Sequence, residues 1–144
     1  MGRPVKIAIG LIAVLLMGWI YHGPLGTGEK LINRLELQGR AAVVETQLTG
    51  IQVRMHRDPL ARVAELSGPA DDLQREGLGS QWGINDYVRA VPGIGAVRWA
   101  DQPGSARVVP LLAETEFLVF LAYLIGLGLG WLFFGRRKRQ SFLD

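Results

Sequence analysis

The stretch Phe117–Phe134, FLVFLAYLIGLGLGWLFF, decides how the rest of the chain is organised, because eighteen residues pass without a charge. A helix of this length covers about 27 Å, close to the roughly 30 Å hydrocarbon core of a bilayer. Gly135 follows, and then come four basic residues: Arg136, Arg137, Lys138 and Arg139. Lys and Arg beside a span resist translocation, so this end is expected in the cytoplasm. We therefore predict a C-terminal transmembrane helix over residues 110–135 and a basic cytoplasmic tail over 136–144.

The N-terminus has a second apolar segment, which follows the basic residues Arg3 and Lys6. Ile7–Tyr21 carries no charge, and this is the charge-then-apolar order of a signal sequence. No small-x-small cleavage site comes after it, and its Trp and Tyr residues lie where an interfacial aromatic anchor belongs. These features favour an uncleaved signal anchor, a transmembrane helix over residues 1–23, over a cleaved signal peptide.

The two basic flanks together predict the topology. Basic residues at both ends of the chain place both termini in the cytoplasm, and two spans satisfy that arrangement. The residues between the spans then lie on the far side of the membrane. The general character of the sequence suggests a bacterial protein. For such a protein, this arrangement predicts two spans in the inner membrane and a middle domain in the periplasm.

Charge is unevenly distributed along the chain, although its 144 residues have a formal net charge of +3. His22–Glu116 holds ten Lys and Arg residues against twelve Asp and Glu residues, so the middle is slightly acidic. A DNA- or RNA-binding module would carry its basic excess on the folded domain. The pattern therefore argues against nucleic acid as a partner, and the absence of cysteine excludes disulfides and thiolate metal sites.

Between linkers at 24–30 and 102–109, residues 31–101 are expected to fold as one small α+β domain. Helical spacing of apolar residues predicts a helix over Glu29–Leu48, with Gly50 as its left-handed cap. Ile51–Arg57 and Ala61–Ser67 read as two half-buried strands, the first with a clear alternation of apolar and polar residues. The Asp-Pro turn between them indicates an antiparallel hairpin.

The second half of the domain begins with a helix signal. Asp71 is expected to be the N-cap, and Gln74, three residues on, completes a capping-box pattern. The glycines of the following GLGS segment weaken the helix, so we expect it to break there and to resume over Gln81–Val91. Ile94–Ala100 follows as a third strand, with Val97 and Trp99 directed inward.

The order helix, strand, strand, helix, strand carries local motifs that resemble the BON domain family. The matching segments are Gly50–Arg54, Ala64–Ala70 (AELSGPA) and Val88–Val97 (VRAVPGIGAV). They are similar to that family's pattern of a strand, then x-L-S-G-x-V, a helix, and v-x-G-V-x-x-V, and the match covers about residues 31–100. The resemblance implies a BON-like α-β-β-α-β sandwich between two transmembrane helices. It also implies a non-enzymatic envelope module associated with membrane surfaces, phospholipid or envelope proteins.

The sequence offers no constellation of residues for catalysis or for a metal. His22 and His56 lie far apart with no ligand spacing around them, so we expect them to be ordinary exposed polar residues. Asp71 and Asp72 are better explained by N-capping than by paired catalytic carboxylates. We therefore expect a protein that is not an enzyme and that uses no cofactor.

Trp82 and Tyr87 are the candidate binding residues of the domain. Core packing is the simpler interpretation of such aromatic side chains, and it applies to Trp99 as well. The alternative is that Trp82, on a glycine-flanked loop, enters the headgroup region of the bilayer or contacts a partner protein. Tethering at both ends keeps the domain near the membrane in either case.

Glycines are the candidate packing residues of the spans. Gly126 and Gly130 lie one helical turn apart and permit another helix to approach closely. Ordinary span composition explains these glycines equally well, because glycines are common in spans. The alternative is that they pack against Gly10 and Gly18 of the first span, against a second copy of the chain, or against a larger complex. The basic flanks also attract anionic lipid by about 1 kcal/mol per residue.

Two functions remain open from the sequence. The first is a non-enzymatic two-span inner-membrane protein whose periplasmic BON-like domain binds the membrane surface or envelope partners. The second is an accessory subunit of a large inner-membrane complex, which docks through its transmembrane helices. The expected partners are accordingly membrane lipids, other transmembrane helices or membrane-protein subunits, and a second copy of this chain.

Overall fold

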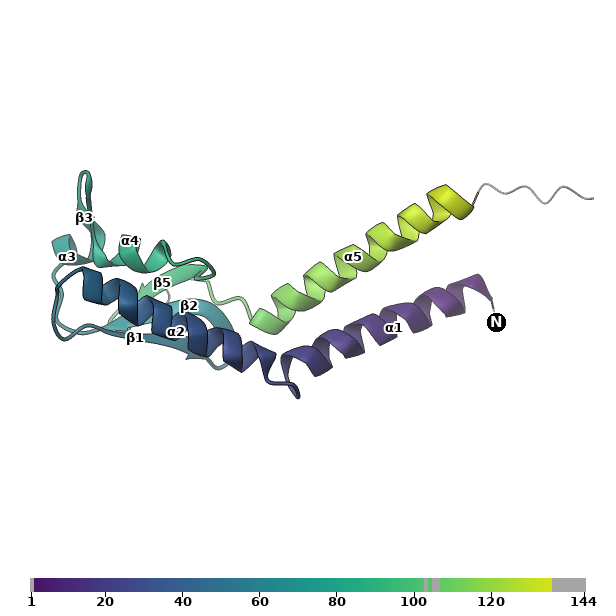
Figure 1. Cartoon of the computed structure of the whole chain (residues 1–144), viewed down its shortest axis with the longest axis horizontal. Helices are drawn as coiled ribbons and strands as arrows, with labels where there is room; N and C mark the ends of the chain where they lie inside the picture. Colours follow the sequence, from purple (N-terminus) through teal and green to yellow (C-terminus); the bar gives the residue numbers. More distant parts are fainter. Residues whose placement is uncertain (1, 103, 105–106, 136–144) are drawn as a thin grey trace, which may run out of the picture.

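The computed structural model describes residues 2–102, 104 and 107–135, which form two distinct parts (Figure 1). A small domain of helices and strands lies at one end, and two long helices, α1 (Arg3–His22) and α5 (Leu111–Phe134), extend side by side from it. The mixed α+β class predicted from the sequence is therefore confirmed. The predicted basic tail, Arg136–Arg139 included, lies outside the described residues.

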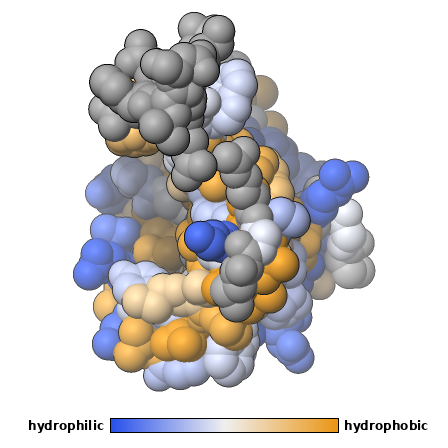
Figure 2. Space-filling model, turned by 90° about the vertical axis from the view of Figure 1, so that its right-hand side faces the viewer, coloured by the Kyte–Doolittle hydropathy of each residue, from blue (hydrophilic) through white to orange (hydrophobic). Residues whose placement is uncertain are grey.

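Both long helices are compatible with membrane spans in length and composition. Their large apolar side chains remain mostly exposed, as expected for helices that lipid surrounds. Seen from the end where α1 begins, hydrophobic side chains gather in the middle of the face and strongly hydrophilic ones lie mostly around its edges (Figure 2). The bounds of α1 and α5 agree with the two apolar segments that the sequence predicts as helices.

Helix α2 (Thr27–Glu45) follows α1 after a tight turn. Gly26 occupies its N-cap in the left-handed conformation, with a φ of 64°. Gly28, in the first turn, is buried, and a Cβ atom there would lie 2.6 Å from Cε1 of His22. Glycine is therefore what allows the first turn of α2 to lie so close to His22 at the end of α1.

The end of α2 differs from the sequence prediction. The helix stops at Glu45 and not at Leu48, and the backbone N–H of Thr46 closes its last turn onto Val43. Gln47 then takes a left-handed conformation, with a φ of 59°, before the position at which we expected Gly50 to cap the helix. The residue that terminates the helix in the left-handed conformation is therefore a glutamine. Residue type would not predict this, because glycine is the usual residue at such a position.

Three strands form the sheet of the domain: β1 (Gln52–Arg57), β2 (Leu60–Ser67) and β5 (Ala96–Trp99). Their spatial order is β1-β2-β5, so β2 is central, antiparallel to β1 and parallel to β5. Val53 lies opposite Leu66, which in turn lies opposite Trp99. The predicted hairpin is confirmed, and the predicted third strand is present with shorter bounds.

The connection from β2 to β5 contains two short helices and a small hairpin: α3 (Asp72–Glu76), β3 (Gly77–Leu78), β4 (Gln81–Trp82) and α4 (Ile84–Arg89). The predicted capping box is confirmed, because Gln74 N donates to Asp71 Oδ1 at 2.8 Å and Asp71 N donates to Gln74 Oε1 at 3.0 Å. The predicted break in the helix is also confirmed. The resumed helix, however, begins at Ile84, because the chain forms the β3–β4 hairpin over the residues before it.

One face of the sheet packs against α2 and α4 and encloses the core (Figure 1). Successive side chains of a strand point to opposite faces, so every second residue of each strand enters this core. The buried core residues are Ile32, Leu35, Val43, Val53, Met55, Ala64, Leu66, Ile84, Val88, Ile94, Val97, Trp99 and Leu111. The alternation predicted for Ile51–Arg57, in which Val53 and Met55 share the buried face, and the inward directions predicted for Val97 and Trp99 are therefore confirmed.

The first turn of α5 is fixed to the domain. Leu111 is only 6% exposed and belongs to the domain core. Arg62 Nε of β2 donates to Glu114 Oε2 at 2.7 Å, and Ala61 forms an isolated bridge with Pro110. The span thus leaves the domain as a continuation of its core, and a movement of α5 would be transmitted to the central strand.

Candidate functional site

The structure brings the two predicted binding residues together on the surface. Trp82 of β4 and Tyr87 of α4 pack edge to face, with ring centroids 5.4 Å apart and planes at 77°. Trp82 is nevertheless 60% exposed, whereas Trp99 is buried in the core. Core packing therefore accounts for Trp99 but not for Trp82.

The aromatic pair forms one wall of an open groove of about 380 Å³ between α2 and α4. We call this surface the aromatic groove. Its lining residues are Gln38, Ala41, Ala42, Glu45, Trp82, Tyr87, Ala90, Val91 and Pro92. The lining combines small alanine side chains with two polar side chains of α2, Gln38 and Glu45, so its chemistry suits an apolar or aromatic segment that also carries polar groups.

Close backbone packing fixes the hairpin that carries Trp82. A Cβ atom on Gly83 would lie 2.3 Å from the backbone nitrogen of Gly77 and 2.5 Å from the backbone oxygen of Arg75. Gly77 itself has a φ of 77°, a left-handed conformation in which other residues are strained. Gly77, one of the glycines that weaken the predicted helix, thus also helps to position Trp82.

A polar network beneath the hairpin anchors α3. Arg75 donates two hydrogen bonds to Asp101, at 3.1 and 2.8 Å, and its guanidinium lies 4.1 Å from the ring centroid of Trp99. Trp99 Nε1 donates to Asn85 Oδ1 at 2.9 Å, and Asn85 Nδ2 donates to Glu76 Oε1 at 2.9 Å. The hydrogen bonds from Arg75 lower the pKa of Asp101 below its usual value. These contacts join α3, α4 and β5 behind the aromatic groove.

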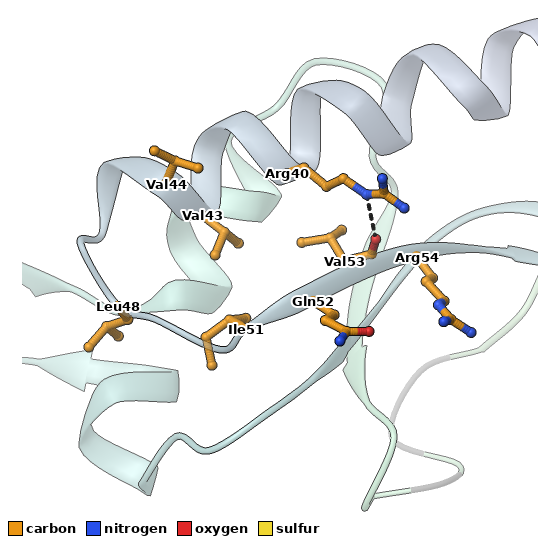
Figure 3. Close-up of a pocket in the computed structure, with 8 residues that line it drawn as sticks. All are labelled: Arg40, Val43, Val44, Leu48, Ile51, Gln52, Val53 and Arg54. Atoms are coloured by element: carbon orange, nitrogen blue, oxygen red, sulfur yellow. Dashed lines mark hydrogen bonds between the residues drawn. The ribbon is translucent and has the colours of Figure 1, made fainter.

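A second groove, of about 410 Å³, lies on the other side of α2, where the helix turns into β1. Its lining residues are Arg40, Val43, Val44, Leu48, Ile51, Gln52, Val53 and Arg54 (Figure 3). Arg40 reaches from α2 toward β1 and donates from Nε to the Val53 carbonyl at 3.2 Å, whereas Arg54 extends away from the helix. The two cations do not converge on one point, so the geometry gives no built anion site.

Side chains of α2 instead satisfy the free edge of β1. Glu36 accepts from the backbone nitrogen of Met55 at 3.2 Å, from Arg57 at 2.9 Å and from Arg40 at 2.5 Å. Burial alone would raise the pKa of Glu36, but these hydrogen bonds and charges outweigh burial and lower the pKa. Together with the bond from Arg40 to Val53, they cover edge groups that could otherwise pair with another strand.

The face of the sheet opposite the core carries a compact charged cluster. His56 Nδ1 donates to Glu65 Oε1 at 2.6 Å, and Arg98 donates to the same carboxylate from the neighbouring strand. Burial would raise the pKa of Glu65, but the hydrogen bonds from His56 and Arg98 lower it below its usual value. The cluster joins β1, β2 and β5 through one carboxylate, which is a structural role.

The spans use two of the four predicted packing glycines against each other. A Cβ atom on Gly10 would lie 2.8 Å from the Tyr123 hydroxyl, and one on Gly18 would lie 2.7 Å from Glu116 Oε1. Tyr123 also donates a hydrogen bond to the backbone oxygen of Ile7 at 2.6 Å. Gly10 and Gly18 therefore act as notches in α1 that receive polar side chains of α5.

The other two glycines do not join this contact. Apart from the adjacent residues and nearby backbone of α5 itself, no described atom lies within 4 Å of the positions that Cβ atoms would occupy on Gly126, Gly128 and Gly130. Packing of Gly126 and Gly130 against the first span is thus not observed. A second copy or another helix remains as the predicted contact of this face.

The histidines lie in separate places. His22 packs against Gly28 at the junction of α1 and α2, whereas His56 belongs to the charged cluster of the sheet. Over residues 2–102, 104 and 107–135, no group of three or more His, Cys, Asp and Glu side chains is arranged to hold a metal. Lys6 lies exposed in the first turns of α1, whereas the side chain of Arg3 lies outside the described part of the chain.

Several residues of these sites have no separate signal in the sequence. Ala42 reads as a core position of α2, yet it is half-buried and lines the aromatic groove. Tyr123 and Glu116 become significant only once the register of α5 against α1 is known. For the aromatic groove, the sequence signal is the alanine pair Ala41 and Ala42 on α2. For the contact between the spans, the signal is the presence of the polar residues Glu116 and Tyr123 in the otherwise apolar α5.

No family model, curated protein or solved structure matches the chain, so the resemblance to the BON family stays a prediction.

Proposed function

We propose that this chain is a non-enzymatic, membrane-anchored binding protein that holds a protein partner in the aromatic groove of its middle domain. One observation carries the proposal: Trp82 is 60% exposed on a hairpin that its glycines hold in place. A large exposed indole on a rigid element is a common centre of protein interfaces, because it buries much area at little entropic cost. Tyr87 and the alanines beside it supply the remaining apolar contact area.

The location of the groove favours a protein partner over the bilayer. The β3–β4 hairpin stands at the end of the domain remote from the two long helices (Figure 1). A membrane that α1 and α5 span would therefore lie at the opposite end of the domain. Partners that reach the groove are more naturally other envelope proteins than lipids of that same membrane.

We further propose the setting that the sequence predicts. The chain is a two-span protein of a bacterial inner membrane, with both termini in the cytoplasm and the domain in the periplasm. The domain is BON-like, which is supported by the order α2, β1, β2, then α3 with α4, and β5. The slightly acidic charge of the middle region agrees with a domain that does not face anionic headgroups.

Site-specific photo-crosslinking in the membranes of the source cells tests the groove. A photoreactive residue at Ala41, inside the groove, is expected to give one discrete protein product, and one at Gln52, on the opposite side of the domain, to give none. Trp82→Ala should reduce that product about tenfold or more, because interface tryptophans are frequent hot spots. Val44→Ala, an exposed apolar residue outside the groove, is the matched control.

Three results would contradict this proposal. Equal products from Ala41 and Gln52 would indicate random collisions at the membrane. Labelling of lipid alone from Ala41 would assign the groove to the bilayer surface. An unchanged product in Trp82→Ala would remove the indole from the interface.

A second candidate function is an accessory subunit that docks through its spans. The observation that favours it is the open face of α5 at Gly126 and Gly130, whereas the glycines of α1 are already in use. Two glycines four residues apart lie on one helix face and permit a second helix to approach closely. Without a partner helix, only lipid acyl chains would contact this face of α5.

Native gel electrophoresis in a mild detergent tests this second function. The double variant Gly126→Leu with Gly130→Leu is expected to release the chain from a defined large assembly. Gly128→Leu adds the same side chain to the opposite face and should leave the assembly intact. A parent chain that migrates as a free monomer would rule the accessory-subunit function out, and one that migrates as a dimer would assign the glycine face to a second copy.

A further inference from the structure

The carboxylate of Glu116 lies across the first span in an unusual setting. Its Oε1 atom would be 2.7 Å from a Cβ atom on Gly18, so the side chain passes over α1 at that glycine. Among the described residues, its Oε2 atom is buried without a hydrogen-bond partner. A carboxylate in apolar surroundings is stable only when a proton or a cation compensates its charge.

Glu116 also lines a groove at the surface of the paired spans. The groove measures about 420 Å³, and we call it the interfacial groove; its lining residues are Ile12, Leu15, Leu16, Trp19 and Glu116. The four residues of α1 follow the spacing i, i+3, i+4 and i+7, so they form one strip along the helix. Ile12, Leu16 and Trp19 are each more than half exposed, which leaves the strip open to the surrounding lipid.

The depth of the groove matches the level of lipid headgroups. Eighteen helical residues, Phe117–Phe134, follow Glu116 in α5, a rise of about 27 Å, which is close to the roughly 30 Å thickness of the hydrocarbon core. Glu116 therefore reaches the boundary of the core on the side opposite the basic tail. Trp19 lies beside it, and tryptophan prefers this same boundary.

We propose that the interfacial groove binds a bilayer phospholipid whose headgroup ends in a primary ammonium group. The ammonium would pair with the Glu116 carboxylate and lie against the Trp19 indole, which attracts cations. One acyl chain would run along Ile12, Leu15 and Leu16 toward the middle of the membrane. An anionic headgroup without an amine would instead be repelled by the carboxylate.

The inference rests on membrane insertion of α1 and α5, which is part of the proposed function, and not on the aromatic groove. Trp82→Ala is therefore expected to leave lipid binding unchanged. The two proposals can fail separately, because one is read from protein crosslinks and the other from bound lipid.

Native mass spectrometry of the full chain in detergent tests the proposal. Phosphatidylethanolamine and phosphatidylglycerol with identical acyl chains are added in equal amounts. One ethanolamine lipid per chain should be retained about tenfold better than the glycerol lipid, the size of effect expected from a charged hydrogen bond. Glu116→Gln should abolish this preference, whereas Glu114→Gln, whose carboxylate pairs with Arg62, should preserve it.

Folding of the variants is checked by circular dichroism. If Glu116→Gln does not fold, Trp19→Leu removes the indole, keeps the carboxylate and should reduce the preference. Equal retention of both lipids by the parent chain would overturn the proposal, as would a preference that survives Glu116→Gln. A photoreactive residue at Leu16 that labels a polypeptide, with no lipid preference, would assign the groove to a partner helix instead.

Discussion

The domain and the pair of spans use the same residue types in opposite ways. In the domain, apolar side chains fill the core, and charged side chains form hydrogen bonds at its surface. Glu36 does so at the edge of β1, and Glu65 does so on the outer face of the sheet. Between the spans, polar side chains of Tyr123 and Glu116 lie at the contact, and the apolar side chains face outward. The difference reflects the solvent, because lipid offers no hydrophobic drive for two apolar helices to associate.

Glycine follows the same division. In the domain, Gly77 turns the chain with a positive φ, and Gly83 permits two backbones to approach. In the spans, Gly10 and Gly18 have ordinary helical backbone and serve only as notches for side chains of α5. Stability of the domain should therefore depend strongly on its buried apolar residues, and pairing of the spans should depend on a few modest contacts.

The largest expected effect is at the domain core. Ile32 is fully buried at 0% exposure, so Ile32→Ala should destabilise the full chain by about 2–5 kcal/mol. Leu37→Ala removes a similar side chain from the same helix at 67% exposure and should change stability by less than about 0.5 kcal/mol. Thermal unfolding in a mild detergent, followed by near-ultraviolet circular dichroism, measures both. Equal losses in the two variants would mean that α2 does not pack as described.

Acid should weaken the domain through the carboxylates at its edge and outer face. The pKa values of Glu36 and Glu65 are lowered from 4.5 in the folded chain, so their contribution is complete above pH 4.5 and is lost as pH falls below it. Glu36→Gln should cost about 1–2 kcal/mol near neutral pH, because it weakens charge-assisted hydrogen bonds to Met55 and Arg57. The variant should then lose less further stability than the parent between pH 5 and 3.

Unfolding midpoints measured across this pH range provide the check. Glu29→Gln, an exposed acidic residue in the first turn of α2, is the matched control and should keep the slope of the parent chain. A parent chain whose midpoint is flat down to pH 3 would contradict the role given to the two carboxylates.

Sequence predicts those parts of the fold that local chemistry decides. The capping box of Asp71 and Gln74 needs only neighbours in the chain, and the alternation of Val53 and Met55 needs only one strand. The break after α3 is predicted for the same reason, because glycine weakens any helix. What local chemistry leaves open is that the break forms a hairpin which exposes Trp82.

The candidate sites depend on contacts between distant segments. The aromatic groove needs Ala41 of α2 beside Tyr87 of α4, and nothing in either segment alone indicates the other. The open face at Gly126 is similarly a result of register, since Gly10 and Gly18 are matched to Tyr123 and Glu116 instead. Residue identity therefore indicates candidates, and tertiary packing decides which of them stay exposed.

The smallest expected effect is at the contact between the spans. Tyr123→Phe removes the hydroxyl that donates to the Ile7 carbonyl at 2.6 Å, and hydrogen bonds between membrane helices contribute only about 0.6 kcal/mol on average. Hydrogen–deuterium exchange of α1 amides in lipid nanodiscs should therefore accelerate about threefold or less. Tyr21→Phe, at an exposed position of α1, should leave the exchange unchanged. An acceleration of a hundredfold or more would mean that this one bond holds the spans together, and that the division between a strongly driven domain and modestly paired spans is wrong.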